Sequence, residues 1–499
     1  MEKIKRLKNL FKREKIDGYI VPKNDDFFGE YVPEHNDRLN YISNFSGSYG
    51  FALILKNENY LFVDGRYTLQ AKNQSGKEFT ICEIPYVWPK NLEKIKNSNI
   101  GFNPNLFTEN LLIKYFDRKA NLIPVIFDFK NKIEKKFFNF FELKKNVTGE
   151  NSISKINKIK KILYKSKINY LYISSSENVN WLLNIRGKDL PNSPLANCKL
   201  IFSRNGKSYL LTNLKKVVNL KKKNFKKILF SEEKNFFQII SKFTKGNFCI
   251  DDNTCSIFEK ELIKSKFKIA SKIDPIYNLK SVKNITEINN TKDAHILDGI
   301  ALTKFLYWYK TNNLKITEKK IEKKLEYFRK RSNSYLFPSF DTIAGSGPNG
   351  AIIHYKSNNI TNRRIKKKDI LLIDSGGQYK WGTTDVTRTI SNGVYSNKIK
   401  NNFTRVLKGH IAVVTCDLKK NYNGSLIDKL ARRNLNNAGL NYPHGTGHGV
   451  GFFLNVHEGP QNISSNNKVT LKKGMILSNE PGYYLENRYG IRIENLIYI

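Results

Sequence analysis

Acidic side chains that can bind a metal ion stand close together in the last third of the sequence. In DILLIDSGGQYKWGTTDVTRT, a strand-like apolar run ends at Asp374, a glycine-rich turn follows, and a second strand-like run begins after Asp385. A hairpin that returns after ten intervening residues places two carboxylates side by side. Either aspartate alone is also typical of a turn or capping residue, so the pair gains meaning only if further ligands converge.

A glycine-rich and histidine-rich segment supplies the next candidates. The stretch HGTGHGVGFFLNVHEGP, residues 444–460, contains three of the seven histidines of the chain, His444, His448 and His457. Glycine alternates with other residues around His448, which frees the backbone of side-chain bulk and suits close approach to a ligand. The alternative is a flexible loop with incidental histidines, which we favour less because such a segment gives a core nothing to pack.

Two further acids lie on predicted strands, Glu480 in MILSNEPGYY and Glu494 in YGIRIENLIYI. Alternation along the second strand places Arg492 and Glu494 on one face and Ile491 and Ile493 on the other. An acid within a short apolar strand is costly unless it is neutralised. For Glu494 alone, a surface salt bridge with Arg492 is an equal alternative.

Together, four carboxylates and one imidazole form an oxygen-rich set that can hold two divalent cations. Four negative charges balance two cations of charge +2, so the cluster can be buried as a neutral unit. Oxygen ligands favour manganese over metals that prefer thiolate, with cobalt or zinc as possible replacements. Two metal ions about 3.5 to 4 Å apart share a water molecule and make it hydroxide near neutral pH.

The elements that position these residues follow two α/β segments. The first begins with an amphipathic helix, and apolar runs such as GFALIL and NYLFVDGRY predict buried strands. The second begins near Gly149 and repeats the alternation of helix and strand. From about Lys283 the pattern changes to long helices and then to glycine-rich strands. The predicted domains are α/β over 1–126, α/β over 127–282, and α+β over 283–499, which carries the chemistry.

The first of the long helices shows apolar residues at helical spacing. Ile296 and Ile300 lie on one side, with Leu297 and Ala301 beside them. This spacing predicts an apolar stripe that faces a core.

Length and cysteine content limit the class of protein. A chain of 499 residues that is 40% hydrophobic is long enough for several cores. The first residues contain no apolar stretch typical of a secretory signal, and no later run is long enough to span a membrane, so we expect a cytoplasmic protein with no membrane partner. The five cysteines are scattered and include no C-x-x-C pair, which indicates neither a disulfide framework nor a thiolate zinc site.

The formal net charge of +42 raises the hypothesis of a nucleic-acid partner. Its distribution argues against that hypothesis, because lysines occur along the whole chain without clustering and outnumber arginines 69 to 17. Readout of phosphates and bases usually relies on arginine. Enrichment of residues with AT-rich codons accounts for the excess, so we expect no nucleic-acid partner.

The motifs resemble those of the pita-bread metallopeptidases, and specifically the three-domain Xaa-Pro aminopeptidase P branch. The order Asp, ten residues, Asp, His, Glu, Glu matches the five metal ligands of that family, and HGTGHGVGFFLNVHEGP, NEPGYY and GIRIEN are specific to the branch. FSGSYG, DGRY, WLLNIRGKDLP and SFDTIAGSGPNGAIIHY extend the resemblance over nearly the whole chain. The implied fold is two creatinase-like α/β N-terminal domains followed by a pita-bread catalytic domain, here without the usual C-terminal extension.

The resemblance also implies a role for each ligand. Asp374 binds one metal ion, His448 and Glu480 bind the other, and Asp385 and Glu494 bridge both. A metal-bridging hydroxide then attacks the carbonyl group before proline at the second position of a peptide, and Glu480 transfers the proton.

Four other residues are assigned to the substrate. By resemblance, His354, His444 and His457 contact the substrate and stabilise the reacting centre, and Arg66 in DGRY is a weaker candidate that is equally typical of an ion pair. The remaining histidines, His35, His295 and His410, are predicted to be surface or helix-packing residues.

Other interpretations stay open. A dipeptidase acting on Xaa-Pro, similar to prolidase, shares the fold, and a non-catalytic pita-bread protein that binds nucleic acid or a protein partner is a further alternative. The retained set of five ligands and the three-domain length favour the aminopeptidase. The family's first-domain motif His-x-x-Glu-Tyr has Phe27 in place of histidine, which leaves the metal ligands untouched. Members of the family are usually dimers, so a homodimer is expected.

Overall fold

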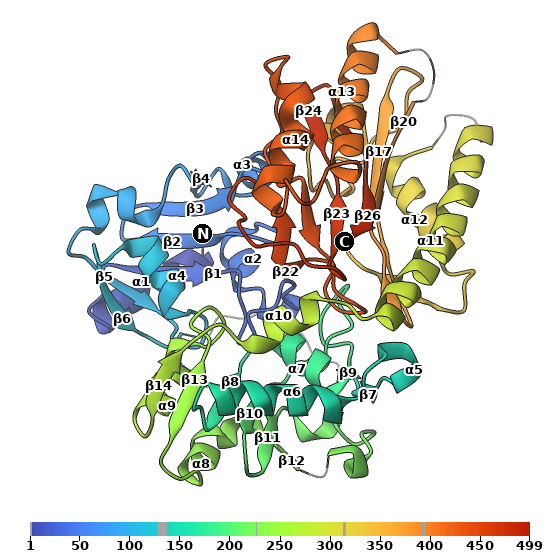
Figure 1. The fold of residues 1–499 in the computed structure, drawn as a ribbon. Helices are drawn as coiled ribbons and strands as arrows, with labels where there is room; N and C mark the ends of the chain where they lie inside the picture. Colours follow the sequence, from blue (N-terminus) through green and yellow to red (C-terminus); the bar gives the residue numbers. More distant parts are fainter. Residues whose placement is uncertain (1, 128–136, 226, 313–315, 392, 394) are drawn as a thin grey trace. The chain divides into compact units, whose positions relative to one another are not determined.

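The computed structural model describes residues 2–127, 137–225, 227–312, 316–391, 393 and 395–499 (Figure 1). The chain divides into two compact units. The first consists of Met1–Leu143, Glu150–Pro191 and Leu195–Ile276, and the second of Lys144–Gly149, Asn192–Pro194 and Tyr277–Ile499. Within the described ranges, every helix is too short or too polar to cross a lipid bilayer.

The first unit contains two six-stranded mixed sheets of the same topology. The first sheet has the order β4-β3-β2-β1-β5-β6, and its strands are β1 (Gly18–Pro22), β2 (Phe51–Leu55), β3 (Asn59–Asp64), β4 (Thr80–Ile84), β5 (Asn99–Phe102) and β6 (Asn121–Pro124). The central strands β1 and β2 are buried along their whole length, as expected for strands covered on both faces. The strands predicted from GFALIL and NYLFVDGRY are confirmed as β2 and β3.

The second sheet repeats that order as β12-β11-β10-β8-β13-β14. Its strands are β8 (Tyr170–Ile173), β10 (Lys199–Ser203), β11 (Ser208–Leu211), β12 (Ile228–Ser231), β13 (Asn247–Ile250) and β14 (Lys268–Ser271). In both sheets the central strand is antiparallel to one neighbour and parallel to the other. The repetition of one α/β plan, predicted from the alternation of patterns, is therefore confirmed. A short strand pair links β7 (Phe141–Glu142) with β9 (Ile185–Arg186).

Helices accompany these sheets. In the first half of the unit they are α1 (Glu2–Arg13), α2 (Arg38–Ser43), α3 (Thr68–Ser75) and α4 (Glu109–Phe116), and in the second half α6 (Ser152–Lys165), α7 (Ser176–Leu183), α8 (Phe236–Ser241) and α9 (Ile257–Lys264). The helix α1 buries Ile4, Leu7 and Phe11 at a spacing of three to four residues.

The second unit combines small antiparallel sheets with long helices. Its sheets have the orders β15-β18-β19, β16-β17-β20, β22-β21-β23-β26 and β24-β25. The strands are β15 (Tyr335–Pro338), β16 (Ile343–Ser346), β17 (Ile370–Ser375), β18 (Gly377–Tyr379), β19 (Gly382–Thr383), β20 (Val386–Ser391), β21 (Gly447–Gly449), β22 (Glu458–Ile463), β23 (Ile476–Asn479), β24 (Gly482–Leu485), β25 (Tyr489–Arg492) and β26 (Asn495–Tyr498). The helices are α11 (Ile285–Thr311), α12 (Glu318–Arg329), α13 (Asn397–Val414) and α14 (Gly424–Asn436), with the shorter α5 (Lys145–Thr148) and α10 (Pro275–Ser281).

Two helix pairs enclose the strands of the second unit. The helices α11 and α12 pack on β17 and β20 through one core cluster, and α13 packs on β17 and β25 through another. Figure 1 shows β17 and β20 between these two pairs. This arrangement holds the strand ends rigidly, which is what a site built from several strands requires.

The predicted apolar stripe on α11 is wrong in part. Ile296 and Ile300 are 62% and 47% exposed, whereas Leu302, Phe305 and Tyr309 are buried. The helix carries apolar residues on more than one face, so periodicity alone did not identify the face that packs on the strands. Ala301 is buried, as predicted.

Candidate metal centre

Asp374 and Asp385 come together at one end of a two-stranded ladder. The strand β17 pairs with β20 from Ile370↔Ser391 to Ser375↔Val386, so Asp374 lies opposite Thr387, two residues after Asp385. The intervening residues form the short hairpin of β18 and β19. The predicted hairpin is confirmed, and both aspartates are buried.

Glycines bring the backbone around His448 against its neighbours. A Cβ atom added to Gly447 would lie 1.9 Å from the carbonyl oxygen of Ser478, and one added to Gly449 would lie 2.3 Å from that of Glu458. The residues on both sides of His448 must therefore lack a side chain. This absence lets the backbone of β21 pack between β22 and β23 in the sheet. The sequence predicted close approach to a ligand, whereas the structure shows that Gly447 and Gly449 allow close approach of neighbouring backbone.

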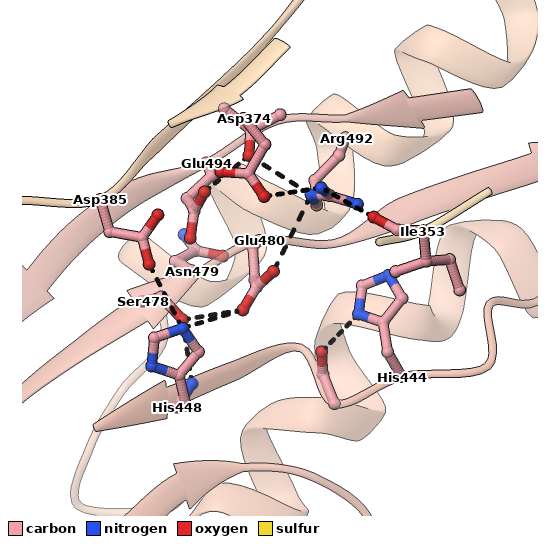
Figure 2. A network of polar contacts seen from close by, with 12 residues as sticks. Ile353, Asp374, Asp385, His444, His448, Ser478, Asn479, Glu480, Arg492 and Glu494 are labelled. Atoms are coloured by element: carbon pink, nitrogen blue, oxygen red, sulfur yellow. Dashed lines mark hydrogen bonds and ion pairs between the residues drawn. The ribbon is translucent and has the colours of Figure 1, made fainter. Parts of the chain in front are cut away.

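The imidazole of His448 turns its Nε2 atom toward two acids (Figure 2). Its Nδ1 atom is 2.9 Å from the carbonyl oxygen of Gly449, and a carbonyl only accepts, so Nδ1 carries the proton in that hydrogen bond. The Nε2 atom is 3.4 Å from Asp385 Oδ2 and 3.4 Å from Glu480 Oε1. A neutral imidazole oriented in this way by its other nitrogen is a typical metal ligand.

Glu480 follows the point at which two strands separate. The pairing of β23 with β26 ends at Asn479↔Asn495. Beyond it, the backbone N–H of Glu480 donates to the Thr446 carbonyl oxygen at 2.8 Å. The Ser478 hydroxyl donates to Glu480 Oε1 at 3.0 Å. These contacts fix both the main chain and the carboxylate of Glu480.

Glu494 reaches the cluster from the other separating strand. Its backbone N–H donates to the Thr387 carbonyl oxygen at 3.3 Å, and the Thr387 hydroxyl donates to Glu494 Oε2 at 2.6 Å. One ligand atom each of Asp385, His448 and Glu494 lies within 4.8 Å of the others. Glu494 as a whole is 1% exposed, so it lies in the interior and not on the surface.

The electrostatics of this cluster fit bound cations. The pKa values of Asp385 and Glu494 are raised well above their ordinary values. Burial is the largest cause, and repulsion from the neighbouring carboxylates is the next. Within the described part of the chain, the buried Asp374 Oδ1 atom has no hydrogen-bond partner. Converging buried carboxylates with an orphaned oxygen are the donor set that hard or borderline divalent metals prefer.

Arg492 lies in the same cluster and pairs with Asp374. Its guanidinium donates to Asp374 Oδ2 at 2.6 Å and comes within 4.0 Å of Glu480 Oε2 (Figure 2). The alternative from the sequence, a surface salt bridge between Arg492 and Glu494, is wrong because both residues are 1% exposed and the arginine faces other acids. Four carboxylates and Arg492 together carry a charge of −3. Two divalent cations would bring the total to +1, so one further negative charge would make the cluster neutral.

Two of the predicted substrate histidines are connected to the metal centre. The His444 Nε2 atom is 2.9 Å from the Tyr484 hydroxyl, which accepts from Arg492 at 2.6 Å. Burial raises the pKa of Tyr484 to about 12, so the phenol stays protonated and donates to His444. The rings of His457 and His448 stack edge to face with centroids 4.2 Å apart.

The third histidine and the arginine are placed less directly. His354 follows Ile353, whose carbonyl oxygen is 3.5 Å from the Arg492 guanidinium. Arg66 belongs to the first unit, where it forms a two-point ion pair with Asp64 at 2.6 and 3.0 Å. Its role in substrate binding therefore stays a prediction.

Ser478, Thr387, Arg388 and Tyr484 are among the residues that contact the cluster or its backbone and that were not predicted. Of these, Tyr484 stands in the NEPGYY motif, and the others carry no signal beyond their proximity to a ligand in the sequence.

Comparisons with known proteins agree with this geometry. Models of the creatinase/prolidase N-terminal domain match residues 3–133 and 131–287, and the model of metallopeptidase family M24 matches residues 289–499. A probable Xaa-Pro aminopeptidase P of Laccaria bicolor is 34% identical over 528 residues, which cover 100% of this chain and 82% of that protein. The chain belongs to the Xaa-Pro aminopeptidase P family. Xaa-Pro aminopeptidase 1 of Dictyostelium discoideum is likewise 34% identical, over 84% of its length.

Solved structures of related peptidases also match the chain. X-prolyl aminopeptidase of Caenorhabditis elegans, described as a cytosolic enzyme with a di-nuclear active site, matches with a TM-score of 0.91 at 29% identity, over 100% of this chain and 87% of that one. Prolidase of Pyrococcus furiosus matches with a TM-score of 0.56 at 26% identity and covers 68% of this chain. The predicted fold of two creatinase-like domains and a pita-bread domain is thereby confirmed.

Proposed function

We propose that the protein is a metal-dependent aminopeptidase that hydrolyses the bond before a proline at the second position of a peptide. The observation that carries this proposal is the convergence of four carboxylates, three of them buried, and the His448 Nε2 atom in a chain that aligns end to end with aminopeptidases P. The more distant prolidase structures cover about two thirds of the chain, so the aminopeptidase activity is preferred.

The five ligands divide between two divalent cations. Asp374 would hold one cation, His448 and Glu480 the other, and Asp385 and Glu494 both. When bound, the cations would polarise the scissile carbonyl and lower the pKa of water so that it attacks near neutral pH. The donor set is oxygen-rich, which favours manganese over cobalt and zinc.

The chain's own groups would handle the proton and the substrate. Glu480 lies at the edge of the cluster, with one oxygen held by Ser478 and the other toward Arg492, so its carboxylate can accept a proton from the attacking water and return it to the leaving nitrogen. His457, beside His448, and His354 would stabilise negative charge on the carbonyl oxygen. The Nε2 atom of His444 accepts a hydrogen bond from the Tyr484 hydroxyl, which fixes the orientation of the imidazole. His444 would in turn orient the peptide.

Selection of proline follows from its chemistry. An Xaa-Pro bond is a tertiary amide without an N–H group, so a site selects it by the shape of the ring and by not requiring a donor there. The free amino group at the substrate N-terminus must also be recognised, and the acids of the cluster are candidates because their charge is opposite to that of an ammonium group.

One experiment separates the candidate functions. Purified protein is freed of metal with chelator, reloaded with Mn²⁺, and given Ala-Pro-Ala, Ala-Pro and Ala-Ala-Ala in parallel. Release of alanine from Ala-Pro-Ala, with little cleavage of Ala-Ala-Ala, supports the proposal. Cleavage of Ala-Pro alone indicates a prolidase-like dipeptidase, and cleavage of none of the peptides by the metal-loaded protein supports a non-catalytic function.

We further propose a cytoplasmic homodimer. A related enzyme is described as cytosolic, and the resemblance to the family implies a dimer. On this chain, α13 exposes Leu407, Ile411 and Val414 by 36%, 49% and 59%, at helical spacing on one face. Light scattering should give twice the chain mass, and Ile411→Glu should lower it to a single chain if this face lies between the subunits. A single-chain mass for the unmodified protein would contradict the proposed dimer.

A further inference from the structure

His410 lies on the inner side of α13, where the sequence predicted only a surface or packing residue. Its Nδ1 atom is 3.1 Å from the carbonyl oxygen of Asn479, so Nδ1 donates to that oxygen. The Asn479 side chain donates in return to the His410 carbonyl oxygen at 2.9 Å. The helix and the end of β23 are thus joined by a reciprocal pair of hydrogen bonds.

The same imidazole approaches the second strand. The side chain of His410 also lies near the backbone of Ile493, on the second strand. Beside it, Arg388 donates to the backbone carbonyl oxygen of Glu494 at 2.7 Å. His410 and Arg388 therefore contact the main chain on both strands at the residues next to Glu480 and at Glu494 itself.

These contacts occur where β23 and β26 are no longer hydrogen-bonded to each other. Pairing between β23 and β26 ends at Asn479↔Asn495, and the next residue on each strand, Glu480 and Glu494, is a proposed metal ligand. Beyond that pair, the two main chains bond to different partners, Thr446 and Thr387. The separation between the two carboxylates consequently depends on what holds the fork between the strands.

We infer that His410 is a positioning residue that holds this fork, and thereby sets the spacing of Glu480 and Glu494 around the two cations. The inference rests on the proposed metal centre. It is independent of the substrate, because His410 contacts main-chain atoms and lies on the helix side of the strands. Groups that orient metal ligands without touching the metal typically change metal affinity 10- to 100-fold when they are altered.

Matched substitutions separate positioning from helix packing. His410→Leu removes the Nδ1 donor and leaves an apolar side chain in its place. His410→Asn keeps a donor near the position of Nδ1, which faces Asn479, whereas His410→Gln moves the donor to the position of Nε2. Lys408→Leu, at an exposed position of the same helix, is the control.

The measurement is the binding of Mn²⁺ to metal-free protein by calorimetry, with thermal unfolding of the metal-free form in parallel. We expect His410→Leu and His410→Gln to bind Mn²⁺ at least about tenfold more weakly, His410→Asn to recover most of that loss, and Lys408→Leu to match the unmodified protein. Activity of His410→Leu should return at high Mn²⁺ concentration.

Two outcomes would overturn the inference. In the first, His410→Leu unfolds at lower temperature but binds Mn²⁺ as the unmodified protein does, which makes the residue purely structural. In the second, Asn and Gln behave alike, which removes the role of the Nδ1 donor. If His410→Leu does not fold, the Asn and Gln variants still give this comparison. An unmodified protein that binds no Mn²⁺ instead overturns the metal centre itself, so the two failures are distinguishable.

Discussion

Replacing Thr387 by valine tests the metal centre through a single hydroxyl group. The Thr387 hydroxyl donates to Glu494 Oε2 at 2.6 Å and accepts from Arg492 Nε at 3.3 Å, and valine has nearly the same shape. A hydrogen bond to a charged group contributes about 1.5 to 3 kcal/mol. At about 1.4 kcal/mol for each factor of ten, its loss from an ordered ligand weakens Mn²⁺ binding about 10- to 100-fold.

The assay is a competition titration of metal-free protein with Mn²⁺ and a fluorescent chelator. Ser391→Ala, which removes a hydroxyl from the far end of the same strand, is the control and should bind as the unmodified protein does. Activity of Thr387→Val on Ala-Pro-Ala should require more Mn²⁺ but reach a similar rate at saturation. Binding within twofold of the unmodified protein would refute the view that Thr387 orients a bridging ligand.

Three further predictions follow from the same geometry. Glu494→Ala and Asp385→Ala each remove a proposed bridging ligand, so bound metal measured by mass spectrometry and peptide hydrolysis should be lost together; a variant with full activity would contradict the assigned roles. His457→Ala should bind two metal ions normally and hydrolyse at least about 100-fold more slowly, and an equal fall in metal content would place this residue among the ligands instead. Because burial and neighbouring acids raise the pKa of Glu494 above its unfolded value near 4.5, the metal-free protein should lose stability as pH rises from there toward neutrality. Unfolding temperatures of metal-free Glu494→Gln should fall less over that range, and equal slopes would argue against a raised pKa.

The proposed ligand set was indicated by the sequence because most of its members stand in local patterns. A ten-residue return between apolar strands joins Asp374 to Asp385, and alternating glycines mark His448. Both patterns reflect short-range geometry, in which the chain itself fixes the distance between residues. The repeated α/β plan of the first unit was predictable for the same reason.

The supporting contacts were not predictable, because they join distant segments. The sequence predicts by alternation that Arg492 and Glu494 share a face of their strand. It does not predict that this face is buried, or that Arg492 pairs with Asp374, 118 residues away. His410 gave no signal, since its partners are main-chain carbonyl groups on other elements. Burial of an ion pair depends on the packing of whole elements, which single-residue patterns do not encode. The domain limits at 126 and 282 stay predictions.

Metal content measured together with activity tests the central claim most directly. Protein purified without chelator and reconstituted with Mn²⁺ should bind two ions per chain, and removal of the ions should abolish cleavage of Ala-Pro-Ala reversibly. A chain that binds fewer than two ions while it cleaves this peptide at full rate, or that binds none after reconstitution, would contradict the paired-cation site formed by Asp374, Asp385, His448, Glu480 and Glu494.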